Sequence, residues 1–327
     1  MKKIYIMSTI LLVIGMLVGI SIFTQQRIIE TSSLAARTPR PPDLVEEKKD
    51  EYKFPEFYRG FYLTASQAMN KERLVTWVER AKRANMNAMV IDVQNLRQQR
   101  VNIPKENIQY LLDNGIHPIA RIVIFPDGLR VYPPPAGLLQ DRYDAAIAAC
   151  EIGFKEIQFD YIRFNDSNVA LNLSLEQRYA FIEGILRRLR EKVAPYNVRT
   201  AADIFGRIPF NRNDIIGQRM ESLDLVVDVI CPMAYPSHYW SREQQHDPYK
   251  TVYQTSKRAV ERVQHAIIVT WIQAFEMRLG PNSYSDYIRL QMQAVYDSGA
   301  SGYIFWNARN NYDVPFRVTE EFYRNRQ

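Results

Sequence analysis

From residue 57 onward, short runs rich in β-branched and aromatic residues alternate with amphipathic segments. This alternation predicts parallel strands joined by helices, and eight repeats in roughly 250 residues are typical of a closed (β/α)8 barrel. We therefore expect an α/β chain in which residues 57–327 form a single (β/α)8 TIM barrel. The eight expected strands span residues 59–64, 88–94, 118–125, 156–164, 200–205, 225–235, 266–275 and 302–307.

The segments between these strands place apolar residues at the spacing of one helix face. Ser174, and either Asn282 or Ser283, are suited to cap two helices, and Gly299 is suited to end the second one. A doubly wound sheet is the alternative fold, but it needs a glycine-rich first turn, and residues 64–68 contain no glycine. The expected buried faces comprise Leu74, Trp77, Val78 and Ala81; Tyr179, Ile182, Ile185, Leu186 and Leu189; and Ile288, Met292 and Val295.

The first 56 residues differ in character from the rest of the chain. Lys2 and Lys3 precede an apolar run over residues 4–23, long enough to cross a hydrocarbon core of roughly 30 Å. We expect residues 1–23 to form a cytoplasmic stub and an uncleaved transmembrane signal anchor, with the barrel outside the cytoplasm. A cleaved signal peptide is the alternative and would release the protein. Residues 24–56, rich in proline and charge, are expected to be a flexible tether.

Composition excludes several classes of partner. The 42 Lys and Arg residues exceed the 36 Asp and Glu residues only slightly, without a basic stripe, so we expect no nucleic-acid partner. The four histidines are scattered, so neither a metal nor another cofactor is expected. Cys150 and Cys231 lie in apolar segments, which favours two buried free thiols over a disulfide.

The chemistry of such a barrel lies where its strands end, at the carboxyl-terminal rim. In the fourth expected strand, Glu156, Gln158 and Asp160 share one parity and are expected to face the barrel interior, whereas Ile157 and Phe159 face the helices. Because a buried carboxylate is costly, Asp160 at the strand end is a catalytic candidate. Its structural alternative is an ion pair with Arg163 that only braces the loop.

A second carboxylate, Asp203, ends the neighbouring fifth strand and is the other catalytic candidate. Arg121, a charge inside an apolar strand, is expected to pair with one of the carboxylates. Asp228 lies early in its strand and is expected to be structural. The residues expected to bind substrate around the same rim are Tyr62, Asp92, Gln94, Arg121, Tyr161, Arg163, Tyr235, His238, Trp271, Gln273, Trp306 and Asn307.

Carboxylates, aromatic rings and amides at one rim suit a sugar site. Cleavage of a glycosidic bond needs one protonated carboxyl to donate to the leaving oxygen and one ionised carboxylate as nucleophile or base. Aromatic rings stack on the apolar faces of pyranoses, and amides bind hydroxyl groups. We therefore expect a polysaccharide or oligosaccharide as the substrate.

Six motifs follow one another along the expected barrel: ARIV at 120–123, FDYIRF at 159–164, ADIFG at 202–206, PMAYPSHY at 232–239, WIQAF at 271–275 and WNA at 306–308. In this order they resemble the motifs of the bacterial “putative glycoside hydrolase” TIM-barrel family, whose members are mostly uncharacterised and often membrane-anchored or exported. The resemblance covers residues 57 to 315 and implies the barrel fold and a carbohydrate role.

The chain departs from the family pattern at two places. Pro126 and Asp127 stand where the family often has Lys-Asp, and Ala274 stands where it often has an acidic residue. The leading hypothesis is a glycoside hydrolase that cleaves an envelope or extracellular polysaccharide. Ala274 keeps a second hypothesis open, a carbohydrate-binding TIM barrel without turnover, and another barrel chemistry such as a lyase or deacetylase is a third.

Overall fold

The expected strands close into one parallel barrel in a computed structural model of the chain, which describes residues 52–94, 101–167, 171–324 and 326. Each strand pairs in parallel with its neighbours, and the pairings of β1 with β9 and of β5 with β6 complete the ring. The seventh expected strand is interrupted at Val269 and forms two pieces, β7 and β8. The strands are β1 (Tyr58–Leu63), β2 (Ala88–Asp92), β3 (His117–Val123), β4 (Glu156–Asp160), β5 (Arg199–Phe205), β6 (Val229–Met233), β7 (Ile267–Ile268), β8 (Thr270–Gln273) and β9 (Gly302–Trp306).

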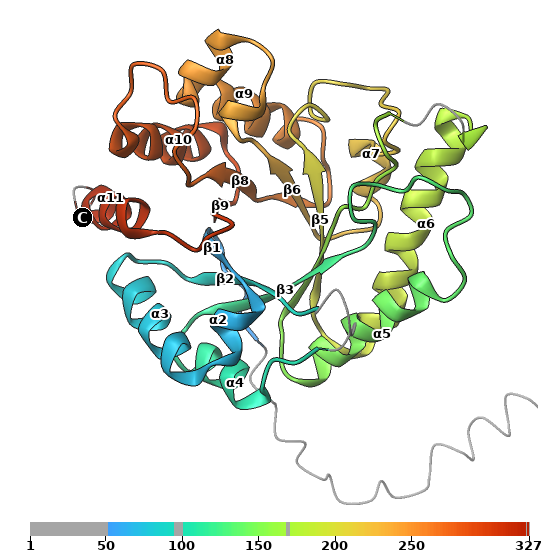
Figure 1. The fold of residues 1–327 in the computed structure, drawn as a ribbon, viewed down its shortest axis with the longest axis horizontal. Coiled ribbons are helices and arrows are strands. Elements are labelled where there is room, and N and C mark those ends of the chain that lie inside the picture. The colour runs from blue at the N-terminus through green and yellow to red at the C-terminus, as the bar shows by residue number, and fades with distance from the viewer. Residues whose placement is uncertain (1–51, 95–100, 168–170, 325, 327) are drawn as a thin grey trace, which may run out of the picture. The chain divides into compact units, whose positions relative to one another are not determined.

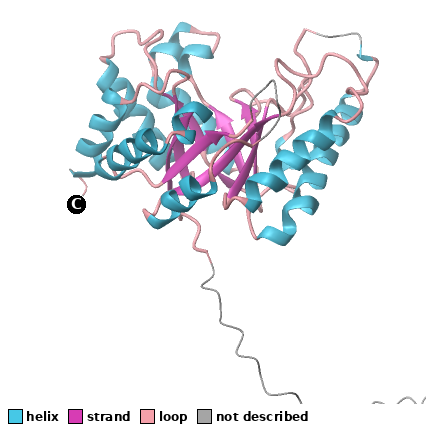
Figure 2. Cartoon of the chain, turned by 60° about the horizontal axis from the view of Figure 1, so that its bottom comes forward, coloured by secondary structure: helices cyan, strands magenta, loops and turns pink. Residues whose placement is uncertain are grey.

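Helices surround this barrel on its outside, as Figure 1 and Figure 2 show. All three predicted apolar helix faces are buried, on α3, α6 and α10, so these predictions are confirmed. The helices are α2 (Ala65–Met69), α3 (Lys71–Arg83), α4 (Lys105–Asp113), α5 (Leu138–Glu151), α6 (Leu175–Val193), α7 (Met220–Leu223), α8 (Arg242–His246), α9 (Pro248–Val260), α10 (Tyr284–Ser298) and α11 (Asp313–Arg324), with 3-10 turns η2 (Ala194–Tyr196) and η3 (Pro236–His238).

The parity prediction for β4 is also confirmed. Ile157 and Phe159 belong to the core between the strands and the helices, whereas Gln158 lies inside the barrel and bonds Asp203 there. A separate inner core fills the barrel and includes Tyr58, Val90, Ile119, Trp271 and Ile304. Because each large apolar side chain contributes about 1.5–3 kcal/mol when fully buried, these two cores supply the main stabilisation.

Local signals define the helix ends. Ser174 caps α6 in a capping box with Gln177, and Ser283, rather than Asn282, caps α10. Gly299 ends α10 in the left-handed conformation, with φ of 80°. Gly302 begins β9 at φ of 139°, where any Cβ would collide with the backbone of Tyr58, so glycine permits the close approach of β9 to β1.

Both cysteines are free and buried, which confirms the predicted thiols. The predicted anchor at residues 1–23 and most of the predicted tether lie outside the described residues. Among the residues that are described, no helix has the length and apolar character needed to cross a membrane. The barrel belongs to a compact unit that runs from Phe54 to Gln327.

Candidate functional site

A cavity of about 410 Å³ opens where the strands end and the β/α loops begin. The residues at its wall come from β3, β4, β5, β6, β8 and β9 and from the loops that follow β3, β4, β5 and β6. This is the rim at which the sequence predicts the site. The predicted site residues that line the cavity are Arg121, Asp160, Tyr161, Arg163, Asp203, Tyr235, His238, Trp271 and Trp306.

Asp160 and Arg121 form the charged centre of this cavity. The Arg121 guanidinium donates to Asp160 Oδ2 from Nε at 2.9 Å and from Nη2 at 2.5 Å, and it donates to Asp92 Oδ1 from Nη1 at 2.5 Å. Arg121 is 6% exposed; burial opposes its charge, but Asp160 and Asp92 keep the pKa of Arg121 well above its ordinary value. Arg121 therefore pairs with two carboxylates, where the sequence predicts one.

The alternative pairing of Asp160 with Arg163 is wrong. Arg163 donates to the Phe164 carbonyl and lies 3.7 Å from Asp166. The other oxygen of Asp160, Oδ1, accepts the backbone N–H of Tyr161 at 2.6 Å. Tyr161 itself adopts the left-handed region, with φ of 52°, a conformation that is uncommon for a bulky residue and frequent near functional sites.

Asp203 occupies a different environment in the same cavity. Its Oδ1 accepts the Trp271 Nε1–H at 2.7 Å and the Gln158 Nε2–H at 2.7 Å, and the residue is 1% exposed. Burial, and then the nearby charge of Asp160, raise the pKa of Asp203 well above its ordinary value, although the hydrogen bonds oppose this rise. Asp203 is therefore the carboxyl that is harder to ionise, whereas Asp160 is the one that the Arg121 guanidinium contacts directly.

Aromatic rings form the wall beside these carboxyls. Trp306 is half-buried, stands edge-on to Trp271 at 5.6 Å between centroids, and lies 4.4 Å from the ring of Tyr62. Tyr235 is buried and contacts His238, which is exposed at the rim. Trp306 therefore offers partly exposed ring surface directly over Arg121, whose guanidinium carbon is 5.1 Å from it.

A smaller cavity of about 260 Å³ adjoins the first and shares Arg121, Asp127 and Tyr161 with it. The predicted residues Asp92 and Gln94 line this second space. Tyr62, also predicted, donates its hydroxyl hydrogen to Asp92 and thereby supports the carboxylate that holds Arg121. Within the described part of the chain, no three His, Cys, Asp or Glu side chains converge as a metal site requires.

Three predicted residues, Tyr62, Gln273 and Asn307, lie outside the linings of both cavities. The Gln273 amide accepts from the Ser237 N–H and donates to two carbonyls of the loop after β8. The Asn307 amide donates to the Ala274 carbonyl and accepts from the Arg309 N–H. Both amides therefore brace rim loops, and strand parity alone could not distinguish this role from substrate binding.

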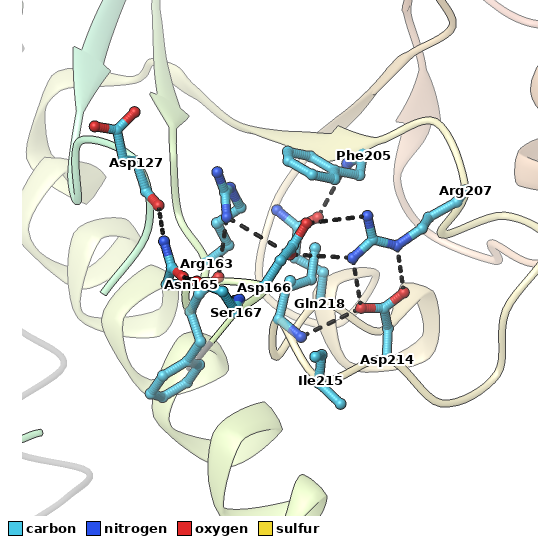
Figure 3. Close-up of polar contacts among 12 residues, drawn as sticks. Asp127, Arg163, Asn165, Asp166, Ser167, Phe205, Arg207, Asp214, Ile215 and Gln218 are labelled. Atoms are coloured by element: carbon cyan, nitrogen blue, oxygen red, sulfur yellow. Dashed lines mark hydrogen bonds and ion pairs between the residues drawn. The ribbon is translucent and has the colours of Figure 1, made fainter. Parts of the chain in front are cut away.

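The structure adds cavity residues that the sequence analysis missed, including Asp127, Arg207 and Trp240. Asp127 is carried on a turn directly after β3, and its carbonyl accepts from the Asn165 amide at 2.7 Å. A Pro-Asp-Gly sequence following a strand could have signalled this turn. Figure 3 shows Arg207 between Asp166 and Asp214, joining two loops at the rim. No comparable local signal marks Arg207, because its partner Asp166 comes from a separate loop, the one after β4.

Comparisons with known proteins agree with this fold. A family model described as “Putative glycosyl hydrolase domain” matches residues 138–312. No curated protein matches the chain. The solved structures that resemble it include the PgaB (BpsB) glycoside hydrolase domain from Bordetella bronchiseptica, at 11% identity and a TM-score of 0.62 over 81% of this chain and 98% of that one.

Two further solved structures have similar scores. The spore cortex-lytic enzyme SleL from Bacillus cereus has 13% identity and a TM-score of 0.57 over 83% of this chain and 75% of that one. The endo-1,4-beta-D-mannanase from Thermotoga petrophila has 13% identity and a TM-score of 0.57 over 83% of this chain and 99% of that one. At these identities the likeness establishes the barrel fold alone.

Proposed function

This chain belongs to the family described as “Putative glycosyl hydrolase domain”, and on that premise we propose that it hydrolyses a polysaccharide through Asp160 and Asp203. The observation that carries the proposal is the pair of carboxyls that line one cavity in different surroundings. Asp160 is held by the Arg121 guanidinium, whereas burial raises the pKa of Asp203. Two carboxyls with divergent protonation are what acid-assisted glycosidic cleavage requires.

In the proposed reaction, the protonated Asp203 donates to the glycosidic oxygen as the bond to the anomeric carbon breaks. Asp160 supplies the ionised carboxylate, either as nucleophile or as the base that takes a proton from the attacking water. Arg121 holds Asp160 in place through two hydrogen bonds. The half-buried face of Trp306 offers a stacking surface for one pyranose ring beside these groups.

A binding barrel without turnover is the second hypothesis, because Ala274 replaces an acidic residue of the family pattern. Ala274 is fully buried, packs in the core between strands and helices, and is not among the residues that line the 410 Å³ cavity. A side chain at this position would therefore point away from Asp160. This placement supports the hydrolytic proposal over the binding-only one.

The proposal extends to location. The charge and apolar pattern of residues 1–23 supports an anchored protein whose barrel meets envelope or extracellular polysaccharide outside the cytoplasm. Deleting residues 4–23 should move the protein from the membrane fraction to the soluble fraction of cells. Full retention of the deleted protein in washed membranes would contradict the anchor.

The activity test measures new reducing ends after incubation of the full-length protein with chitin, β-1,4-mannan and spore-cortex peptidoglycan. These polymers are chosen from the names of SleL, of the mannanase and of a chitinase from Chromobacterium violaceum, whose solved structure also resembles this chain. We expect cleavage of at least one polymer by the wild type and a loss of roughly 10²–10⁴-fold in Asp160→Asn, because the amide can neither attack nor accept a proton.

Asp228→Asn is the matched control. Asp228 accepts hydrogen bonds from Thr200, near the start of β5, and lies outside the 410 Å³ cavity. Its cleavage rate should stay near that of the wild type. Equal rates for Asp160→Asn and the wild type would overturn the two-carboxylate proposal. Polymer binding without any cleavage by the wild type would instead support the binding-only barrel.

A further inference from the structure

Trp240 stands apart from the other tryptophans of the chain. It is 95% exposed, whereas Trp77 is 8% and Trp271 is 1% exposed, and Trp306 is half-buried. Among the described residues, no ring contact, cation–π contact or hydrogen bond engages the Trp240 indole. Trp240 nevertheless belongs to the lining of the 410 Å³ cavity that contains Asp160 and Asp203. An unpartnered indole therefore lies at the mouth of the candidate site.

The backbone on both sides of Trp240 is firmly held. The preceding residue, Tyr239, places its hydroxyl 3.0 Å from the Gly206 carbonyl and 2.7 Å from Thr255 Oγ1, and its own carbonyl accepts from Gln245 at 2.7 Å. The following residue, Ser241, caps α8 in a capping box. Trp240 is therefore displayed on a fixed segment, which reduces the entropy lost when a ligand stacks on it.

We propose that Trp240 is an outer sugar subsite, on which a pyranose ring stacks beyond the rings that contact the carboxyls. The occupant is a neutral stretch of a polymeric glycan that leaves the cavity toward α8. Continuity with the cavity carries this choice, because the same space that contains the carboxyls reaches Trp240. The inference rests on the proposed function and adds to it a requirement for long chains.

The test compares binding of two-unit and six-unit oligosaccharides prepared from chitin, β-1,4-mannan and peptidoglycan glycan strands. The protein is the full chain, and binding is measured by titration calorimetry. Trp240→Ala should weaken six-unit binding about tenfold, which corresponds to the loss of one good aromatic contact. Two-unit binding should not change, because a short sugar can occupy the inner cavity alone. Trp240→Tyr should restore most of the six-unit affinity.

Acrylamide quenching of tryptophan fluorescence gives a second readout that a structural role would not produce. The most exposed indole dominates quenching, so six-unit sugar should protect the wild type more than two-unit sugar does. Trp240→Phe should abolish that difference. Tyr132→Ala is the matched control, because Tyr132 is 42% exposed and lies outside both cavities. It should bind six-unit sugar as the wild type does.

The outcomes separate this subsite from the proposed function. If the wild type binds the six-unit sugar and Trp240→Ala binds it equally well, the subsite is overturned and the hydrolase proposal stands. Equal weakening for both lengths would place Trp240 at the inner site and also overturn the inference. A change in sedimentation mass on mutation would assign the indole to contact with a second copy. If the wild type binds no probe, both proposals fall.

Discussion

Strand β4 carries a buried carboxylate at each end, and the two carboxylates have different surroundings. Glu156 begins the strand and accepts from the Tyr58 hydroxyl at 2.7 Å, with His117 Nε2 at 3.2 Å. Asp160 ends the strand and accepts from the Arg121 guanidinium. Both side chains face the barrel interior, both are buried, and both contact a basic residue. Burial and a basic partner therefore do not distinguish a catalytic candidate from a structural residue.

The difference lies in what surrounds each carboxylate. Glu156 is 1% exposed and is enclosed by Tyr58 and His117, and the Tyr58 hydroxyl also accepts from Arg199 at 2.9 Å. A cavity of about 340 Å³ at that end is lined by Arg199 and Asp228 but not by Glu156. Asp160 instead meets an open cavity, an aromatic wall and a second carboxyl with a raised pKa. Access from an open cavity and a second carboxyl with a raised pKa distinguish the carboxyl-terminal end of β4.

The largest effect within this comparison is expected for Asp203→Asn, which changes the second carboxyl of the cavity that contains Asp160. Hydrolysis should fall roughly 10²–10⁴-fold, because asparagine cannot release a proton to the leaving oxygen. The fold should survive, since an amide oxygen can still accept from Trp271 and Gln158. The measurement is the initial rate of reducing-end release, with circular dichroism as the check on folding.

The same variant also tests the raised pKa of Asp203. A folded-state pKa above the unfolded value near 3.8 gives stability that is complete below that value and is lost as pH rises through the raised pKa. Asp203→Asn, neutral at every pH, should lack this loss. The measurement is the free energy of unfolding in urea from pH 4 to pH 9, with Asp228→Asn as the control variant. An identical pH slope in Asp203→Asn and the wild type would contradict the buried, protonated state.

A smaller effect on turnover is expected for Trp271→Phe. The Trp271 Nε1–H bond to Asp203 Oδ1 lowers the pKa of Asp203, so its removal should raise that pKa further. Asp203 would then stay protonated to higher pH, and the alkaline limb of kcat/KM should move upward, with a loss of only several-fold in rate. A limb that moves to lower pH would show that another group sets it. Trp306→Phe, which leaves this hydrogen bond intact, is the control.

The smallest effect on turnover is expected for Glu156→Gln, at the start of β4. The rate should stay within about twofold of the wild type, because Glu156 is not among the residues that line the three cavities. Stability should fall by about 1–3 kcal/mol, since Tyr58 and His117 both contact Glu156 Oε2 and glutamine has one acceptor oxygen in place of two. Urea midpoints measure the loss. A rate loss comparable to that of Asp160→Asn would break the distinction between the two ends of β4.

The sequence predicted the barrel well because its signals are local. Strand runs and helix faces follow periods of about two and 3.6 residues, which depend on neighbouring positions and not on distant contacts. The same parity placed Gln158 and Asp160 in the interior correctly. The break at Val269 between β7 and β8 was not visible, because the apolar run continues through it.

The site was only partly predictable, because strand parity says where a side chain points and not what it meets there. It led to Arg121 but could not show that Arg121 holds Asp92 and Asp160 together. Strand parity predicted Gln273 to bind substrate, whereas its amide oxygen accepts the backbone N–H of Ser237. It overlooked Trp240, which lies in a loop without periodicity.

The sequence by itself determined the order of strands and helices, the interior face of β4 and the rim at which carboxylates and aromatic rings collect. Only the tertiary structure decided that Arg121 contacts both Asp92 and Asp160 at that rim and that the side chain of Trp240 stays exposed. The physical reason is distance along the chain. Trp271 reaches Asp203 across 68 positions, and Asn307 reaches Ala274 across 33. The raised pKa of Asp203 and the cavity beside it exist only after the barrel has closed.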